Sequence, residues 1–91
     1  MSGVKLPKSA ELGYSLLEVL REAPNGLTTK QIDEAVAIRI GLTSEQSEVI
    51  HSGSRTEFAY RLAWERTRAK KRGQIEQAPG RLWRLVNVQK L

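Results

Sequence analysis

The hydrophobic period of the sequence changes once, at Gly73. Before this glycine, apolar residues recur at the spacing of amphipathic helices. After it, the segment 82–86 (LWRLV) places Trp83 and Leu85 on one face of an expected strand. A second short strand is expected over 74–77, with an Ala-Pro-Gly-Arg turn between the two. The chain is therefore expected to end in a β-hairpin that follows a run of helices.

Turn-forming residues divide the part before the hairpin into helical segments. The first helix is expected over residues 10–22, with Ser9 as its N-cap. The sequence Ala-Pro-Asn-Gly at 23–26 ends this helix, because Pro24 cannot continue it and Asn-Gly tolerates a left-handed turn.

The second helix is expected to begin after Thr28, which forms a capping-box pattern with Gln31. Gly41 is well placed to end it, because glycine readily adopts the left-handed conformation found after a helix. Its expected apolar face consists of Ile32, Ala35, Val36, Ile38 and Ile40.

A short helix and a long helix are expected to follow. The short one is capped by Thr43 or Ser44 and runs to about Ile50, with a His-Ser-Gly break after it. Ser54 and Glu57 form a second capping-box pattern that opens the long helix, which ends at the glycine where the period changes.

This order of elements is that of a winged helix-turn-helix. Three main helices, one short inserted helix and a two-stranded wing give a mainly α domain of the α+β class, in which the long helix is the recognition helix. We expect residues 1–91 to form a single domain with an ordered core over about 9–88, since this length suits one hydrophobic core.

The long helix is amphipathic and unusually basic. At 100° per residue, Phe58, Leu62 and Ala69 form the expected core stripe, with Ala59 and Ala63 beside it. The far side carries Glu57, Arg61, Trp64, Arg68, Lys71 and Arg72. The wheel therefore predicts that the basic residues gather on one flank, where a solvated surface is the alternative to a binding surface.

Charge is divided unevenly along the chain. Residues 1–53 hold five basic and seven acidic side chains, whereas residues 54–91 hold ten basic and three acidic ones, which gives net charges of −2 and +7. An excess of one sign in one half favours a polyanionic partner, and we expect double-stranded DNA.

Composition excludes several other classes. The sequence has no cysteine and a single histidine, His51, so neither a disulfide framework nor a Cys/His metal site is expected. We expect no catalytic residues, no metal and no cofactor, because no Ser-His-acid set or Gly-rich phosphate loop can be assembled. No apolar run approaches membrane-spanning length and no signal peptide is recognisable, so we expect a cytoplasmic protein with no membrane partner.

The expected DNA contacts follow from position on the fold. Residues early in a recognition helix reach base edges, and flanking elements meet phosphates. The candidates for base contact are Arg55, Thr56, Tyr60 and Arg61. The candidates for backbone contact are Thr29, Lys30, Arg68, Lys71, Arg81 and Arg84.

The aromatic residues are expected either to stack on a base or to belong to the core. Tyr60 and Trp64 are candidates for stacking on a modified base. A helical tryptophan more often closes the edge of a small core, and this is what we expect for Trp64. Trp83 is expected to be a core residue that anchors the wing to the helices.

The chain also resembles the N-terminal domain of Mrr-type restriction endonucleases, most closely from residue 42 onward and more loosely over residues 15–20 and 28–43, so that the resemblance covers most of the chain. The residues that carry this resemblance are Ser52, Gly53, Phe58, Arg61, Trp64, Arg66, Thr67, Lys70, Lys71, Gly73, Gly80, Trp83 and Arg84. Gly80 lies one residue farther from its tryptophan than is usual in the family. Ala69 and Gln74 stand where the family has large apolar residues, and Arg68 and Arg72 add charge there.

The resemblance implies a winged helix that brings DNA to a separate nuclease domain, in enzymes associated with modified DNA. It leaves open whether a modified base is recognised, whether a nuclease or other effector accompanies this domain, and which oligomer forms. The alternative function is a winged helix used for protein–protein contact or dimerisation. Salt dependence separates the two, since phosphate contacts release counterions and an apolar protein interface does not.

Overall fold

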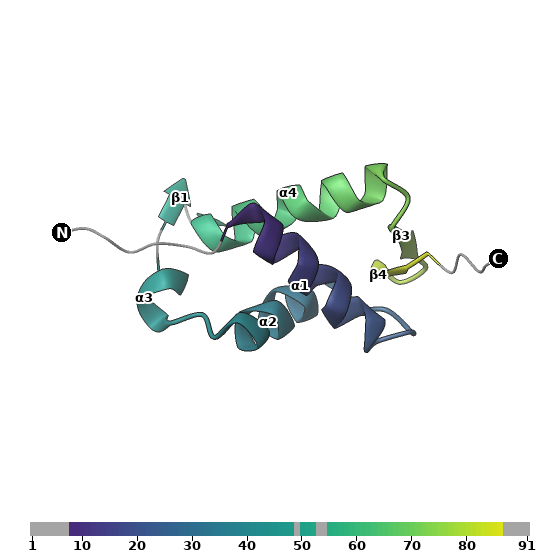
Figure 1. Cartoon of the computed structure of the whole chain (residues 1–91), viewed down its shortest axis with the longest axis horizontal. Coiled ribbons are helices and arrows are strands. Elements are labelled where there is room, and N and C mark those ends of the chain that lie inside the picture. The colour runs from purple at the N-terminus through teal and green to yellow at the C-terminus, as the bar shows by residue number, and fades with distance from the viewer. Residues whose placement is uncertain (1–7, 49, 53–54, 87–91) are drawn as a thin grey trace.

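The computed structural model describes residues 8–48, 50–52 and 55–86 of the chain. Helices occupy most of it, and a β-hairpin ends it (Figure 1). In chain order the elements are α1 (Ser9–Arg21), α2 (Thr29–Ile40), α3 (Ser44–Ser47), β1 (Ile50–Ser52), β2 (Arg55–Thr56), α4 (Glu57–Lys71), β3 (Ile75–Ala78) and β4 (Leu82–Leu85). The mainly helical domain with a terminal two-stranded wing is the predicted winged helix.

Helices α1, α2 and α4 enclose the core, with α1 packed against both of the others. The apolar faces predicted for α1 and α4 supply most of it, because each helix buries the residues that recur at helical spacing. The buried apolar residues are Leu12, Leu16, Val19, Leu20, Ile32, Val36, Phe58, Leu62, Ala69 and Ile75. The predicted core stripe of the long helix is therefore confirmed at Phe58, Leu62 and Ala69.

The wing consists of β3 and β4, paired antiparallel with Ile75 opposite Leu85 and Ala78 opposite Leu82. Its other edge is tied to the segment between α1 and α2. The Leu27 N–H donates to the Trp83 carbonyl oxygen over 2.9 Å, and the Trp83 N–H donates to that of Leu27 over 2.7 Å. Because β4 is held from both sides, the hairpin is fixed against the helices rather than attached only through α4.

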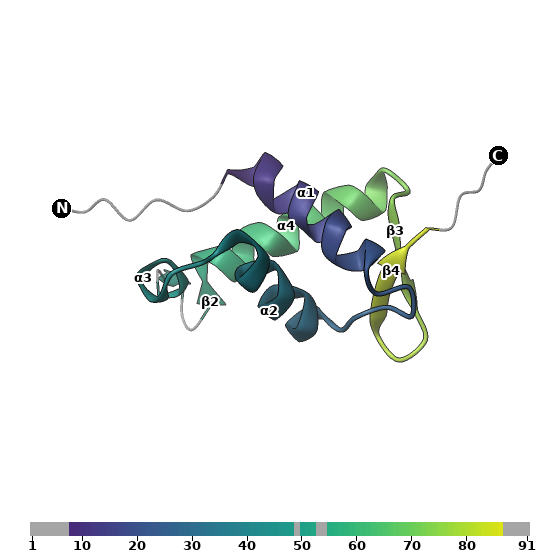
Figure 2. The same cartoon turned by 60° about the horizontal axis from the view of Figure 1, so that its bottom comes forward.

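The wing and the inserted elements lie at opposite ends of the molecule. The hairpin follows the C-terminal end of α4, whereas α3, β1 and β2 lie near its N-terminal end (Figure 2). Helix α4 thus spans the domain, and its C-terminal half is the part that borders the wing.

The caps of α2 and the end of α4 agree with the sequence. The Gln31 N–H donates to Thr28 Oγ1 and the Thr28 N–H donates to Gln31 Oε1, which is the predicted capping box. Gly41 has a φ of 68° and Gly73 a φ of 76°, the left-handed conformation that a glycine adopts at low cost where a helix ends.

The predicted start of α1 was wrong by one residue and that of α4 by two. Ser9 is the first residue of α1 and Lys8 is its N-cap, with the Lys8 N–H bonded to Glu11. Helix α4 begins at Glu57, and its N-cap is Thr56, whose hydroxyl accepts the Ala59 N–H over 3.1 Å. Ser54, the predicted cap, lies outside the described residues.

The inserted segment also differs from the prediction. Helix α3 ends at Ser47 instead of about Ile50, and Ile50–Ser52 forms β1, which pairs antiparallel with β2. The short Thr43-capped turn has too few residues to bury a face of its own, and strand pairing takes over where it ends. The sequence did not reveal this two-stranded element.

One residue of the predicted apolar face of α2 points away from the core. Ile32 and Val36 are buried, but Ile38 is 81% exposed. Ile38 follows Ile32 by six residues, which at about 100° per residue points its side chain about 120° away from that of Ile32.

No helix in the described part of the chain combines the length and apolarity needed to cross a bilayer.

Candidate nucleic-acid interface

Helix α4 presents its basic side chains on two faces. On the wing side, a groove of about 540 Å³ is lined by Ala63, Arg66, Thr67, Lys70, Lys71 and Trp83. On the opposite side, a hollow of about 450 Å³ lies between α4 and α1, and both Arg68 and Arg72 line it together with Tyr14. The prediction that the basic residues gather on one flank was therefore wrong, because α1 and the wing cover different sides of the same helix.

The wing-side surface is continuous from α2 across α4 to the wing. Arg66 donates to Asp33 of α2 over 3.4 Å, and Lys30 lies one helical turn before Asp33, on the same side of α2. One turn after Arg66, the Lys70 Nζ lies 5.8 Å from the ring centroid of Trp83. These contacts bring the N-terminal end of α2, the middle and end of α4, and strand β4 to one surface.

Trp64 lies on the outer face of α4 and not in the core. It is 47% exposed, and Tyr60 packs against it edge to face with ring centroids 6.5 Å apart. The guanidinium of Arg68 lies 5.8 Å from the Trp64 ring centroid. The core interpretation of Trp64 is therefore wrong, although the stacking of an arginine on it is present.

Trp83 is partly buried and packs against the hydrophobic core. Its predicted role as the anchor of the wing agrees with this position and with its two hydrogen bonds to Leu27. The same side chain forms one wall of the wing-side groove. Trp83 thus joins the core to the candidate interface.

Most arginines on the domain are paired with carboxylates. Arg61 donates to Glu57 over 2.8 Å, Arg84 donates to Glu76 across the hairpin over 2.7 Å, and Arg68 pairs with the buried Glu65. Arg66 is only 12% exposed and pairs with Asp33. Such pairs compensate charge within the domain, so these four arginines contribute less to the outward field than the sequence suggests.

Six other cations form no salt bridge with a described residue: Lys8, Lys30, Lys70, Lys71, Arg72 and Arg81. Lys70 and Lys71 line the wing-side groove, and Lys30 lies at the end of α2 that adjoins it. Arg81 is in the hairpin turn, where its φ is 61°. Four of the six therefore lie on α2, the end of α4 and the wing, whereas Arg72 lies on the α1 side and Lys8 caps α1.

The predicted base-contact residues occupy different environments. Arg55 has its backbone in β2, before the helix, and its side chain is outside the described part of the structure. The Thr56 hydroxyl caps α4. Arg61 is held by Glu57, whereas Tyr60 lies on the outer face beside Trp64.

Of the predicted backbone-contact residues, Thr29, Lys30, Lys71 and Arg81 are exposed on the elements of the wing-side surface. Sequence reasoning missed Arg66, Thr67 and Lys70, which line the groove. Their three- and four-residue spacing marks one helical face, but the sequence does not show that Trp83 lies opposite them. The buried Glu65 was missed as well, because a glutamate in a basic helix is ordinarily exposed.

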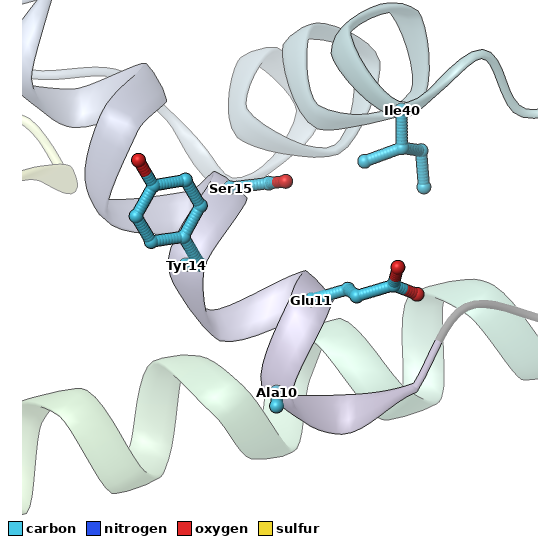
Figure 3. Close-up of a pocket in the computed structure, with 5 residues that line it drawn as sticks. All are labelled: Ala10, Glu11, Tyr14, Ser15 and Ile40. Atoms are coloured by element: carbon cyan, nitrogen blue, oxygen red, sulfur yellow. The ribbon is translucent and has the colours of Figure 1, made fainter.

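A further hollow, of about 470 Å³, lies between the N-terminal half of α1 and the C-terminal end of α2 (Figure 3). Ala10, Glu11, Tyr14, Ser15 and Ile40 line it. Its one charged residue is an acid, and it is on α1 and α2 away from the wing. This lining is unsuited to a polyanion.

Within residues 8–48, 50–52 and 55–86, no three acidic or histidine side chains come together as a metal site.

The fold and this basic surface define a winged-helix domain whose long helix α4 and wing share one cationic groove. A family model described as the Mrr N-terminal domain matches residues 10–88. The chain therefore belongs to the Mrr N-terminal domain family, which indicates a domain related to restriction systems. No curated protein and no solved structure matches the chain.

Proposed function

We propose that this domain binds double-stranded DNA as the non-catalytic reader of a restriction-type system. In the proposed complex, α4 lies in the major groove, and the start of α2 and the wing contact the backbone on either side. The observation that supports this most is the position of the unpaired cations. Lys30, Lys70, Lys71 and Arg81 lie on one continuous wing-side surface, while the neighbouring arginines are paired with carboxylates.

The arrangement suits a polyanion better than a protein surface. Protein interfaces are depleted of lysine and centre on apolar anchors. The wing-side groove instead has two lysines and one tryptophan among its lining residues. Lysine presents a point charge that suits a phosphate whatever the base sequence, so this surface supports binding to the backbone.

The outer face of α4 supports a role in reading the bases. Tyr60 and Trp64 form an aromatic pair with Trp64 about half exposed, and Thr67 lies one turn farther along the helix. Aromatic faces stack on bases with little sequence preference, and a threonine methyl contacts thymine. We propose that this row contacts the bases and that a methylated or otherwise modified base is the preferred target.

A salt-titrated binding assay tests the function. Each phosphate contact contributes about −0.9 to the slope of log affinity against log salt concentration, so these four cations, contacting three or four phosphates, predict a slope of about −3 to −4. A slope near zero, together with self-association, would support the alternative of a protein-contact module. Matched plain, methylated and hydroxymethylated duplexes test the preference for a modified base, and equal affinities for the three would contradict it.

A further inference from the structure

We infer that the groove between α4 and β4 binds one phosphate of the DNA backbone, with Lys70 and Lys71 as its ligands and Trp83 as a positioning residue. This site rests on the proposed DNA-binding function and adds to it a fixed point on the backbone. The groove is lined by Ala63, Arg66, Thr67, Lys70, Lys71 and Trp83. Three features of the groove support the inference.

The first feature is that the Trp83 wall is rigid. Two hydrogen bonds, of 2.7 and 2.9 Å, join the backbone of Trp83 to Leu27, and Gln77 of β3 pairs with it from the other edge. Gly26 packs closely here, since a β-carbon at this position would lie 3.1 Å from the Trp83 carbonyl oxygen. The indole is therefore held in place before any ligand arrives, which reduces the ordering cost of binding.

The second feature is the position of the Lys70 ammonium. Its Nζ lies 5.8 Å from the centroid of the Trp83 ring, within the range of a cation–π contact. This contact does not neutralise the positive charge of Lys70, and it restricts the flexible lysine side chain to the mouth of the groove. Lys70 and Lys71 both form no salt bridge with a described residue. Thr67 lies between them on the helical wheel, so both ammonium groups border the same groove.

The third feature is that the guanidinium and the hydroxyl of the lining, on Arg66 and Thr67, already have partners. Arg66 is paired with Asp33 and is 12% exposed. The Thr67 hydroxyl donates to the Ala63 carbonyl oxygen over 3.1 Å. The two ammonium groups are therefore the charged donors of the lining that form no salt bridge with a described residue, and the chemical complement of such donors is a group that offers only acceptors. A phosphate has this chemistry, whereas the edge of a base pair presents both donors and acceptors.

The test measures the salt slope with a short DNA duplex for four single variants, two double variants and a control. Lys70→Gln and Lys71→Gln are each expected to weaken binding about tenfold at low salt, as for the loss of a hydrogen bond to a charged group. The double variant is expected to lower the slope by about one, because both side chains serve a single phosphate. Lys8→Gln, which removes a charge at the start of α1 far from the wing, is the matched control and should leave the slope unchanged.

The remaining two variants separate positioning from folding. Trp83→Phe retains an aromatic face and should retain most of the affinity, whereas Trp83→Leu should weaken binding about as much as Lys70→Gln. In the Lys70→Gln background, Trp83→Leu should have no further effect on affinity. Thermal unfolding of each variant checks that the fold is intact, and Trp83→Phe keeps the inference testable if Trp83→Leu does not fold.

Each outcome has a distinct meaning. If the wild-type chain shows no salt-dependent binding, the proposed function and this site both fail. If the wild-type slope is steep but the double lysine variant keeps it, the site is wrong and the function stands. A fall of two in the slope of the double variant would mean two separate phosphates and would overturn the single site. Additive effects of Lys70→Gln and Trp83→Leu would show that Trp83 does not act through Lys70.

Discussion

The carboxylate of Glu65 lies directly against Gly13, where α1 crosses α4. A β-carbon at position 13 would lie 2.8 Å from Glu65 Oε1, closer than such atoms approach in practice. Glu65 is 6% exposed and pairs with Arg68. The absence of a side chain at Gly13 therefore lets a charged residue lie under the helix crossing with its partner at the surface.

Gly13→Ala is expected to destabilise the domain by roughly 1–2 kcal/mol, because the buried carboxylate must leave its position beside Arg68. In most helix interiors the same change stabilises by about 0.5–1 kcal/mol. In a Glu65→Ala background we therefore expect the effect of Gly13→Ala to change sign. Urea unfolding of the four proteins measures this, and an equal effect in both backgrounds would show that the contact carries no energy.

Leu62→Ala is expected to reduce the free energy of unfolding by about 2–5 kcal/mol, because the side chain is fully buried and leaves a cavity. Ile38→Ala is the matched control. Its side chain is 81% exposed, so its truncation should change stability by less than about 0.5 kcal/mol. Similar losses in both variants would mean that the burial of α4 is assigned incorrectly.

Much of the fold could be predicted because its signals are local. The Thr28–Gln31 capping box and the glycines at 41 and 73 determine where helices start or stop through bonds within one turn. The start of α4 was misplaced because Ser54 and Thr56 both precede it, and β-pairing of Arg55 and Thr56 with β1 selects the second. That pairing depends on a neighbouring strand which has no clear pattern of its own.

The candidate site was harder to predict because it depends on packing between distant segments. A helical wheel gives the direction of each side chain of α4, but it does not show that Arg68 and Arg72 line a hollow beside α1 while Trp83 faces Lys70. Which charged residues form ion pairs also depends on contacts between segments that are distant in sequence. Arg66 and Asp33 are 33 residues apart in sequence, and only the packing of α2 on α4 brings them together.

Arg81→Ala is expected to weaken binding to all duplexes and to lower the salt slope by about one, since the side chain extends from the turn of the wing. Stability should change by less than about 0.5 kcal/mol, because alanine and arginine bear the same β-carbon strain at a φ of 61°. Arg81→Lys keeps the charge and should keep the slope. An unchanged affinity of Arg81→Ala at low salt would remove the tip of the wing from the interface.

Trp64→Ala is expected to reduce the preference for a modified duplex over a plain one while leaving the salt slope unchanged. The exposed indole neutralises no phosphate, and loss of a stacked aromatic costs about 1–3 kcal/mol for the preferred duplex. Competition between a modified and a plain duplex of one sequence measures the preference, and Trp64→Phe should retain part of it. A lower slope with an intact preference would mean that Trp64 supports the positions of nearby cations and does not touch bases.

The last prediction concerns which side of α4 meets DNA. Lys30 and Arg72 each form no salt bridge with a described residue, so each variant removes one unpaired charge. Lys30 lies one turn from Asp33, whose partner Arg66 lines the wing-side groove. Arg72 lines the hollow against Tyr14 and α1.

If the wing-side surface meets the DNA, Lys30→Gln lowers the salt slope by about one and Arg72→Gln leaves it unchanged. Net charge falls by the same amount in both variants, so a long-range effect of charge alone would change the two equally. The opposite result, with a lower slope only for Arg72→Gln, would place the DNA against α1 and the N-terminal part of the domain. In that case the wing would face away from the DNA, while the winged-helix fold would stand.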